Sequence, residues 1–173
     1  GGSMGSRNTL HFYTHGFEIF SKKIEEASVI ADKMLLGLEQ NKLVSPEIMS
    51  DRYLFYRVPE FLQSFVDFQE RVKKNYSYKV PFERSSHFKF LENAGIWINS
   101  TQNEYMISNL SKGGVIKIFD KKNNKILLND CGFIGKLSSG KIITTQWINP
   151  EYIKKGTKEG FEVSGRFNLV PSN

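Results

Sequence analysis

The apolar residues of this chain follow two different periods. Between residues 17 and 39 they recur every three or four positions, the spacing that places them on one face of an α-helix. From about residue 87 apolar and polar residues alternate instead, as they do in a half-buried β-strand. The two periods predict an α+β protein, with an N-terminal helical region followed by an antiparallel β-sheet, usually half of a sandwich.

Start and stop signals divide the helical region. Asn41 is a stop signal for the first helix. Ser45 followed by Pro46 is typical of a helix start, with a capping serine and a proline at the first helical position. Pro59 is expected to end one helix and start another at the next residue. We therefore predict helices over about residues 17–39, 46–56 and 60–73.

The β region contains closely spaced strands joined by tight turns, with no helix between them. Two hairpins are expected, with connections at residues 120–124 and 138–140. The predicted strands are 87–90, 96–99, 105–108, 115–119, 125–129, 133–137, 141–147 and 161–170. The predicted organisation is a helical region over 1–75, a linker over 76–86 and an antiparallel β region over 87–173, which we expect to be incomplete.

Composition and charge limit the kinds of partner that we expect for this chain. The net charge is +6 and the pI is about 9.3, which favours a polyanion such as nucleic acid, anionic lipid or acidic polysaccharide. An ordinary solvated basic surface is the alternative. No apolar run approaches the ~18 residues of a membrane span, so we expect no membrane partner. The single cysteine, Cys131, excludes an internal disulfide framework and is expected to be a small buried apolar side chain.

The densest group of chemically active side chains lies near the N-terminus. In an extended segment residues 11, 13 and 15 point to one side, so His11, Tyr13 and His15 would converge on one surface. Two imidazoles and a phenol suit a reaction that removes one proton and donates another near neutral pH. Structural roles are the alternative: Tyr13 as a packed ring, His15 as a helix cap and His11 as an exposed residue.

Arg7 and Asn8 precede this group and suit the recognition of an anion. A guanidinium can bind a carboxylate or sulfate with two hydrogen bonds, and an amide can bind the same group. A structural arginine bound to carbonyl groups is an equal alternative. His11 and His15, with Glu18 as a third ligand, have a spacing that could suit a metal on a helix, but the HExxH pattern is absent. We expect no metal and no other cofactor.

A second polar and aromatic group, DRYLFYR, covers residues 51–57. Arg52 and Tyr53 are candidates for a sugar subsite, because an aromatic ring can stack on a sugar. The alternative is an ordinary amphipathic helix with an Asp–Arg pair. Trp97 and Trp147 lie in predicted strands, so core packing is expected for both. His87 opens a strand and is a candidate to reach a cleft between the two regions, with a structural role as the alternative.

The segment GGSMGSRNTLHFYTHGFEIF, followed by amphipathic helices and then antiparallel strands, resembles the heparinase II/III-like polysaccharide lyases. The resemblance covers the order of elements along most of the chain, and its motif content lies mainly in residues 5–18. It implies that the helices are the end of an incomplete α/α toroid and that the strands begin a large β-sandwich. It also implies that the chain is an internal fragment, so that the remainder of the parent polypeptide is itself a partner.

The resemblance further implies β-elimination at a uronic acid. Arg7 and Asn8 would neutralise the substrate carboxylate, Tyr13 would act as base or acid, and His11 or His15 would be its partner. Glu18, Arg52 and Tyr53 would contribute to substrate binding. The rival hypotheses are a non-catalytic carbohydrate-binding or scaffold module and a nucleic-acid binder, the latter supported only by net charge.

Overall fold

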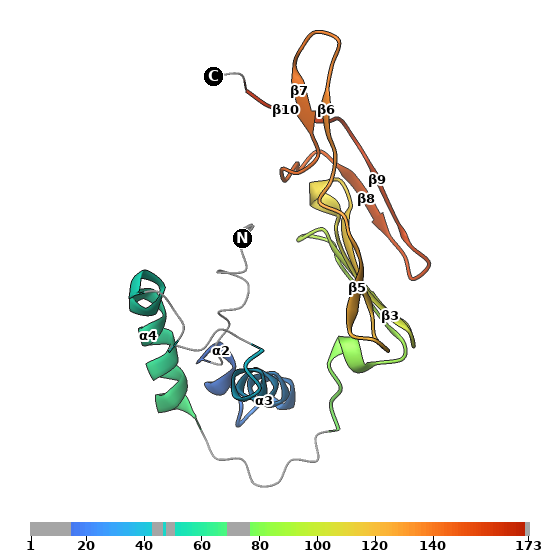
Figure 1. The fold of residues 1–173 in the computed structure, drawn as a ribbon. Helices are drawn as coiled ribbons and strands as arrows, with labels where there is room; N and C mark the ends of the chain where they lie inside the picture. Colours follow the sequence, from blue (N-terminus) through green and yellow to red (C-terminus); the bar gives the residue numbers. More distant parts are fainter. Residues whose placement is uncertain (1–14, 43–46, 48–50, 69–76, 172–173) are drawn as a thin grey trace. The chain divides into compact units, whose positions relative to one another are not determined.

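The computed structural model describes residues 15–42, 47, 51–68 and 77–171 (Figure 1). The chain divides into two compact units, Gly1–Val80 and Pro81–Asn173. Helices occupy the first unit and antiparallel strands the second. The predicted α+β class, with helices first and an antiparallel sheet after them, is confirmed.

The helix predicted over 17–39 is interrupted. The structure has a short helix α2, His15–Glu18, and a separate helix α3, Glu25–Glu39. Between them the hydroxyl of Ser21 donates to the carbonyl of Glu18 at 2.8 Å, and Ile24 is extended with φ −129°. A serine hydroxyl bound to a nearby carbonyl offers the backbone an alternative to helix, which the apolar period alone does not reveal.

The end of α3 agrees with the prediction at Asn41. Asn41 has a left-handed backbone with φ 56°, and its N–H donates to the carbonyl of Leu38 at 3.0 Å. The N–H of Lys42 donates to the carbonyl of Gly37 at 2.8 Å. Asparagine tolerates this conformation better than most residues, and the two bonds satisfy carbonyls at the helix end.

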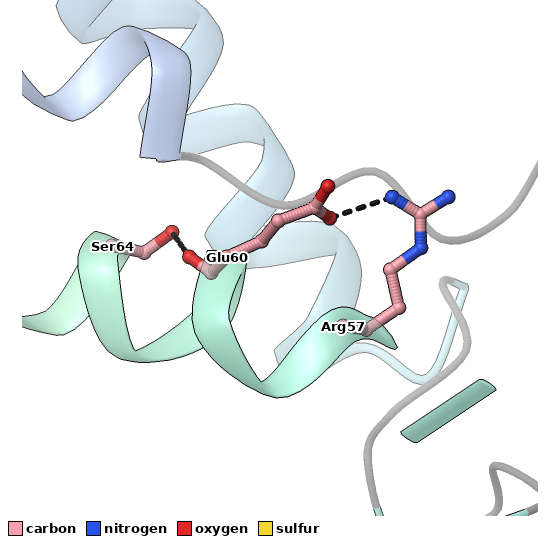
Figure 2. Close-up of polar contacts among 3 residues, drawn as sticks. All are labelled: Arg57, Glu60 and Ser64. Atoms are coloured by element: carbon pink, nitrogen blue, oxygen red, sulfur yellow. Dashed lines mark hydrogen bonds and ion pairs between the residues drawn. The ribbon is translucent and has the colours of Figure 1, made fainter. Parts of the chain in front are cut away.

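Pro59 does not divide the next helix. Helix α4 runs continuously over Asp51–Asp67 with Pro59 inside it, so the predicted break was wrong. Proline lacks an N–H, so one backbone hydrogen bond is missing at this position, but its fixed φ is compatible with a helix and α4 continues past it. Two polar contacts form in this part of α4, as Figure 2 shows. Arg57 pairs with Glu60 at 2.6 Å, and the hydroxyl of Ser64 donates to the Glu60 carbonyl at 2.9 Å.

A carboxylate ties the chain beyond α4 back to α3. Glu25, the first residue of α3, accepts hydrogen bonds from the N–H groups of Ser77 at 2.7 Å and Tyr78 at 3.1 Å. The N–H of Tyr78 is the largest cause of a lowered pKa of Glu25, since it stabilises the charged form. The residues after α4 therefore belong to the helical unit up to about Val80.

The β unit is built on a five-stranded antiparallel meander in the order β1-β2-β3-β4-β5. Each strand pairs with the next along the chain, as tight turns require. The strands are β1 His87–Leu91, β2 Ile96–Ser100, β3 Glu104–Asn109, β4 Val115–Asp120 and β5 Lys125–Asn129. A 3₁₀ turn, η2 (Pro81–Glu83), precedes β1, and another, η3 (Leu110–Lys112), follows β3.

Two smaller sheets follow. β6 (Ile134–Lys136) and β7 (Ile142–Thr144) form a hairpin, visible in Figure 1, to which β10 (Asn168–Leu169) adds a third strand. β8 (Ile153–Gly156) pairs with β9 (Phe161–Ser164). The sequence did not predict β8, and the strand expected over 161–170 is divided between two sheets. β9 ends just before Gly165, where a Cβ would lie 2.3 Å from the ring of Tyr152, so no larger residue fits there without a shift.

Two expectations about side chains were wrong. Trp97 is buried, with 3% of its surface exposed, but Trp147 is 46% exposed. Trp147 lies beyond the end of β7, because the strand stops at Thr144. Cys131 is exposed, since it falls in the connection between β5 and β6 rather than inside a strand. Within the described ranges, no helix is both long enough and apolar enough to cross a membrane.

Candidate functional site

Most of the residues singled out near the N-terminus fall outside the structure's description. Arg7, Asn8, His11 and Tyr13 lie outside the described residues. His15 opens α2, and Arg52 and Tyr53 lie in the first turn of α4, but their side chains are outside the description as well. Glu18 ends α2 with a buried side chain, 2% exposed. The convergence of these residues on one site therefore stays a prediction.

The charge of the chain is divided unequally between the two units. Residues 81–173 contain 13 Lys and Arg against 8 Asp and Glu, a net charge of +5. Residues 1–80 contain 11 against 10, a net charge of +1. The basic residues look evenly spread along the sequence, but counting them by unit shows that the β unit carries most of the excess. A polyanion would accordingly be attracted mainly to the β unit.

The five-stranded sheet has two chemically different faces. Residues directly paired across antiparallel strands lie on the same side, and neighbours along a strand lie on opposite sides. We call one side the basic face. Its members in the first four strands are His87, Lys89, Leu91, Ile96, Ile98, Ser100, Tyr105, Ile107, Asn109, Val115, Lys117 and Phe119. The other side, which we call the covered face, includes Phe90, Trp97, Asn99, Glu104 and Asp120.

The β8–β9 hairpin packs on the covered face. The indole N–H of Trp97 donates to the Thr157 carbonyl at 2.8 Å, and its ring meets that of Phe161 edge-on at 5.2 Å. Gly156 lies against Trp97 and Phe90 so closely that a Cβ would be 3.0 Å from both rings. These contacts bury apolar surface and make this face part of the core.

The strand carboxylates of the sheet also lie away from the basic face. Glu104 and Asp120 are paired with each other on the covered side. No residue of β1–β5 on the basic face is an aspartate or a glutamate, whereas Lys89 and Lys117 are both there and both exposed. The strands therefore place cations on one face without placing carboxylates beside them.

An aromatic cluster occupies one end of the basic face. Phe82 in η2 meets Tyr105 edge-on at 5.6 Å, and Tyr105 lies 6.2 Å from Phe119 in a tilted arrangement. Burial raises the pKa of Tyr105, so its phenol stays protonated at neutral pH and is a poor base. Tyr105 can offer a hydroxyl to a ligand, but the arrangement gives it no means to remove a proton.

Lys121 fastens the segment before β1 to the same end of the sheet. Its ammonium donates to the carbonyls of Arg84 and Thr101, each at 2.6 Å, and contacts the Ser100 hydroxyl at 3.1 Å. It also lies 5.9 Å from the centre of the Phe82 ring. Lys121 therefore has a structural role: its three donors are used to hold the chain that leads into β1.

His87 lies beside this anchor and is neutral at neutral pH. Nη1 of Arg84 is 3.3 Å from Nδ1 of His87. A guanidinium only donates, so Nδ1 accepts and the ring proton is on Nε2. Burial, followed by the charges of Arg84 and Lys89, lowers the pKa of His87. An anion bound nearby would oppose the two charges and favour protonation of the ring.

Sequence reasoning singled out His87 but not Lys89, Lys117 or Tyr105. The signal was present, because alternation places Lys89 on the same side of its strand as His87. What the sequence lacks is the pairing that brings residues of β3 and β4 onto that side. In the described ranges, no group of three or more histidine, cysteine, aspartate or glutamate side chains is arranged to hold a metal ion.

No protein-family model, curated protein or solved structure matches the chain.

Proposed function

We propose that this chain is part of a polysaccharide-lyase-like protein that binds an acidic, uronic-acid-containing polysaccharide and cleaves it by β-elimination. The observation that carries the proposal is the basic face, where lysines, a histidine and aromatic rings lie together and the strands contribute no carboxylate. Carboxylate or sulfate groups of a glycan would pair with the cations, and hydroxyl groups would bond to the polar side chains.

An acidic glycan fits this face better than a nucleic acid does. Proteins that bind single-stranded nucleic acid offer aromatic faces on which successive bases stack. The rings of Phe82, Tyr105 and Phe119 are instead packed against one another, edge-on or tilted. Packing of the rings on one another leaves less free ring face for stacked bases, whereas the Tyr105 phenol can bond to a sugar hydroxyl.

The chemistry of the proposed cleavage falls to the helical unit. β-Elimination needs a neutralised carboxylate, a base that removes the proton beside it and an acid that protonates the leaving oxygen. We assign neutralisation to Arg7 and Asn8, and proton transfer to Tyr13 with His11 or His15. In this proposal α2, α3 and α4 are the last helices of an incomplete α/α toroid, and the strands begin a β-sandwich. Glu18, Arg52 and Tyr53 would support substrate binding within the helical unit.

A non-catalytic carbohydrate-binding module is the second candidate. It is favoured by one observation: the cationic and aromatic residues of the basic face all belong to the β unit, whereas every candidate for proton transfer is in residues 1–80. Binding and cleavage are therefore separable, and the β unit would bind a glycan whether or not the helical unit acts on it.

The test combines binding with product formation in the full-length natural protein. Acidic polysaccharides are incubated with the protein, and the unsaturated sugar formed by β-elimination is followed by ultraviolet absorbance. Tyr13→Phe is expected to abolish the product while leaving binding intact, and Tyr152→Phe, the matched control at a buried tyrosine of the β unit, is expected to retain it. Unchanged activity in Tyr13→Phe would remove Tyr13 from the mechanism. Binding without any product supports the second candidate, and absence of binding to every acidic glycan would overturn both.

A further inference from the structure

One row of paired residues crosses the basic face from its edge strand to β4. Lys89 in β1 pairs with Ile98 in β2, Ile98 pairs with Ile107 in β3, and Ile107 pairs with Lys117 in β4. The row therefore reads lysine, isoleucine, isoleucine, lysine. Because neighbouring strands are about 4.8 Å apart, three spacings separate the backbones of Lys89 and Lys117 by roughly 14 Å.

The two lysines differ from Lys121, Lys154 and Lys155 in what they contact. Lys121 is held by carbonyls, Lys154 contacts the Ser111 hydroxyl at 3.3 Å, and Lys155 pairs with Glu162 at 3.7 Å. Neither Lys89 nor Lys117 forms an ion pair with any residue in the part of the chain that the structure describes, and both are exposed. Their ammonium groups are available to an anion without the loss of an internal ion pair.

The adjoining row supplies groups of a different kind. His87, Ser100, Tyr105 and Phe119 are paired in the same way, two residues farther along each strand. Two residues along a strand correspond to roughly 7 Å, so the two rows lie side by side on one face. One row thus offers two lysine ammonium groups with two isoleucine side chains between them, and the adjoining row offers an imidazole and a phenol.

We infer that the row Lys89–Ile98–Ile107–Lys117 is a binding subsite for an anionic glycan that lies across the strands. One carboxylate or sulfate group pairs with Lys89 and a second pairs with Lys117. The sugar between them places its apolar C–H face on the two half-buried isoleucines. This inference rests on the proposed function and adds to it the residues of a subsite, the direction of the glycan and the spacing of its charges.

The spacing of the two lysines favours a glycan over a nucleic acid strand as the ligand. Phosphates follow one another closely along a nucleic acid, one for every nucleotide. A strand lying along this row would place phosphates over Ile98 and Ile107, which offer them no hydrogen-bond donor. A glycan whose anionic groups are separated by an uncharged portion avoids that mismatch.

The experiment compares lysines on the two faces of the same sheet. Lys89→Gln, Lys117→Gln and the double variant are made in the full chain. Lys125→Gln is the matched control, because it removes the same charge from another exposed lysine. Lys125 lies on the covered side, where it is paired across the strands with Asp120. Binding is titrated with a heparin oligosaccharide, which carries sulfates and carboxylates, and with a hyaluronan oligosaccharide, which carries carboxylates only. Single-stranded DNA serves as the competing polyanion.

Exposed ion pairs are weak, so each single substitution is expected to weaken glycan binding about twofold to fivefold, and the double variant roughly fivefold to twentyfold. Lys125→Gln is expected to bind like the unaltered chain. The dependence of log K on log salt should become shallower by about two in the double variant, since two contacts that release counterions are lost. Circular dichroism and thermal unfolding should match among all variants, because the substituted side chains are exposed.

The outcomes are distinct. A loss of glycan affinity confined to the row variants supports the subsite. If affinity falls for heparin alone, the bound group is sulfate. If affinity falls for both glycans, a carboxylate suffices. Binding that survives in the double variant, or that falls equally in Lys125→Gln, overturns the subsite and leaves the proposed function standing. Failure of the unaltered chain to bind either glycan overturns both. Tighter binding of DNA than of both glycans overturns the assignment to a glycan.

Discussion

The two faces of the five-stranded sheet are formed by the same strands but have different roles: the covered face is part of the core, and the basic face is the proposed binding surface. On the covered face Trp97 is buried, bonded to Thr157 and packed against Phe161 and Gly156. On the basic face Lys89 and Lys117 are exposed. Because a strand alternates its side chains between the two sides, one run of five or six residues can hold a core contact and a binding contact at adjacent positions. Stability and ligand binding should therefore respond to different substitutions in the same strands.

The largest effect is expected from Trp97→Ala on the covered face. Truncating a buried tryptophan leaves a cavity and removes the bond to Thr157, so the free energy of unfolding should fall by about 3–5 kcal/mol. Trp147→Ala is the matched control and should cost less than about 1 kcal/mol, because Trp147 is 46% exposed. Denaturant titration measures both. Equal losses in the two variants would contradict the placement of the core on the covered face.

A smaller loss is expected when a methyl group is added beneath the β8–β9 hairpin. Gly156→Ala places a Cβ 3.0 Å from the rings of Phe90 and Trp97, so one ring or the hairpin must move, at a cost of about 1–3 kcal/mol. Gly160→Ala lies in the same hairpin with no atom within 4 Å of the new Cβ and should be nearly neutral. Thermal unfolding compares the pair, and a neutral Gly156→Ala would show that the hairpin is not seated on those rings.

Lys121→Met should lower stability, although Lys121 contacts Ser100, a residue of the basic face. The substitution keeps the apolar stem but removes donors from the carbonyls of Arg84 and Thr101, with an expected loss of about 1–2 kcal/mol. Lys122→Met, the exposed neighbouring position, should have little effect on unfolding. If both variants unfold alike, Lys121 is not the anchor of the segment before β1, and its charge belongs with the lysines available to a ligand.

The smallest effect is the pH dependence of His87. Its pKa in the folded chain is below the ordinary value of 6.5, so the unfolded chain takes up the proton first as the pH falls. The contribution to stability is complete above about pH 6.5 and is lost between that value and the lower folded pKa. The thermal midpoint should decline on acidification from pH 7.5 to 5.5. The decline should be shallower in His87→Gln, and an equal slope in both proteins would assign it to other groups.

Local signals predicted some elements because their causes are local. Asn41 ends α3 in a left-handed conformation that asparagine tolerates, and the hairpin between β4 and β5 closes through Asp120, whose carboxylate accepts from Asn123 at 3.1 Å. The side chain and N–H of Asn123 are the largest causes of a lowered pKa of Asp120. In both cases the residue and its partners are within a few positions of each other, so the sequence contains the whole interaction.

Other elements depended on contacts that periodicity does not record. The apolar spacing over 17–39 continues through the break at Ile24, where a serine hydroxyl has bound a carbonyl. Pro59 signals a helix end, yet α4 continues past it. The segment that forms β8 contains Lys154 and Lys155 and has no apolar run, yet it pairs with β9. In each case the outcome depends on hydrogen bonds and packing rather than on the local pattern.

The sequence by itself determined the α+β class, the order of helices and strands, and the alternation that places Lys89 beside His87 on one side of a strand. Only the tertiary structure decided that Lys89 and Lys117, 28 residues apart in the chain, share one row. The physical reason is that alternation fixes a side chain's face within its own strand, whereas its neighbours across the sheet depend on the register of pairing. A shift of one residue in β4 would place Lys117 on the covered face and remove it from the row.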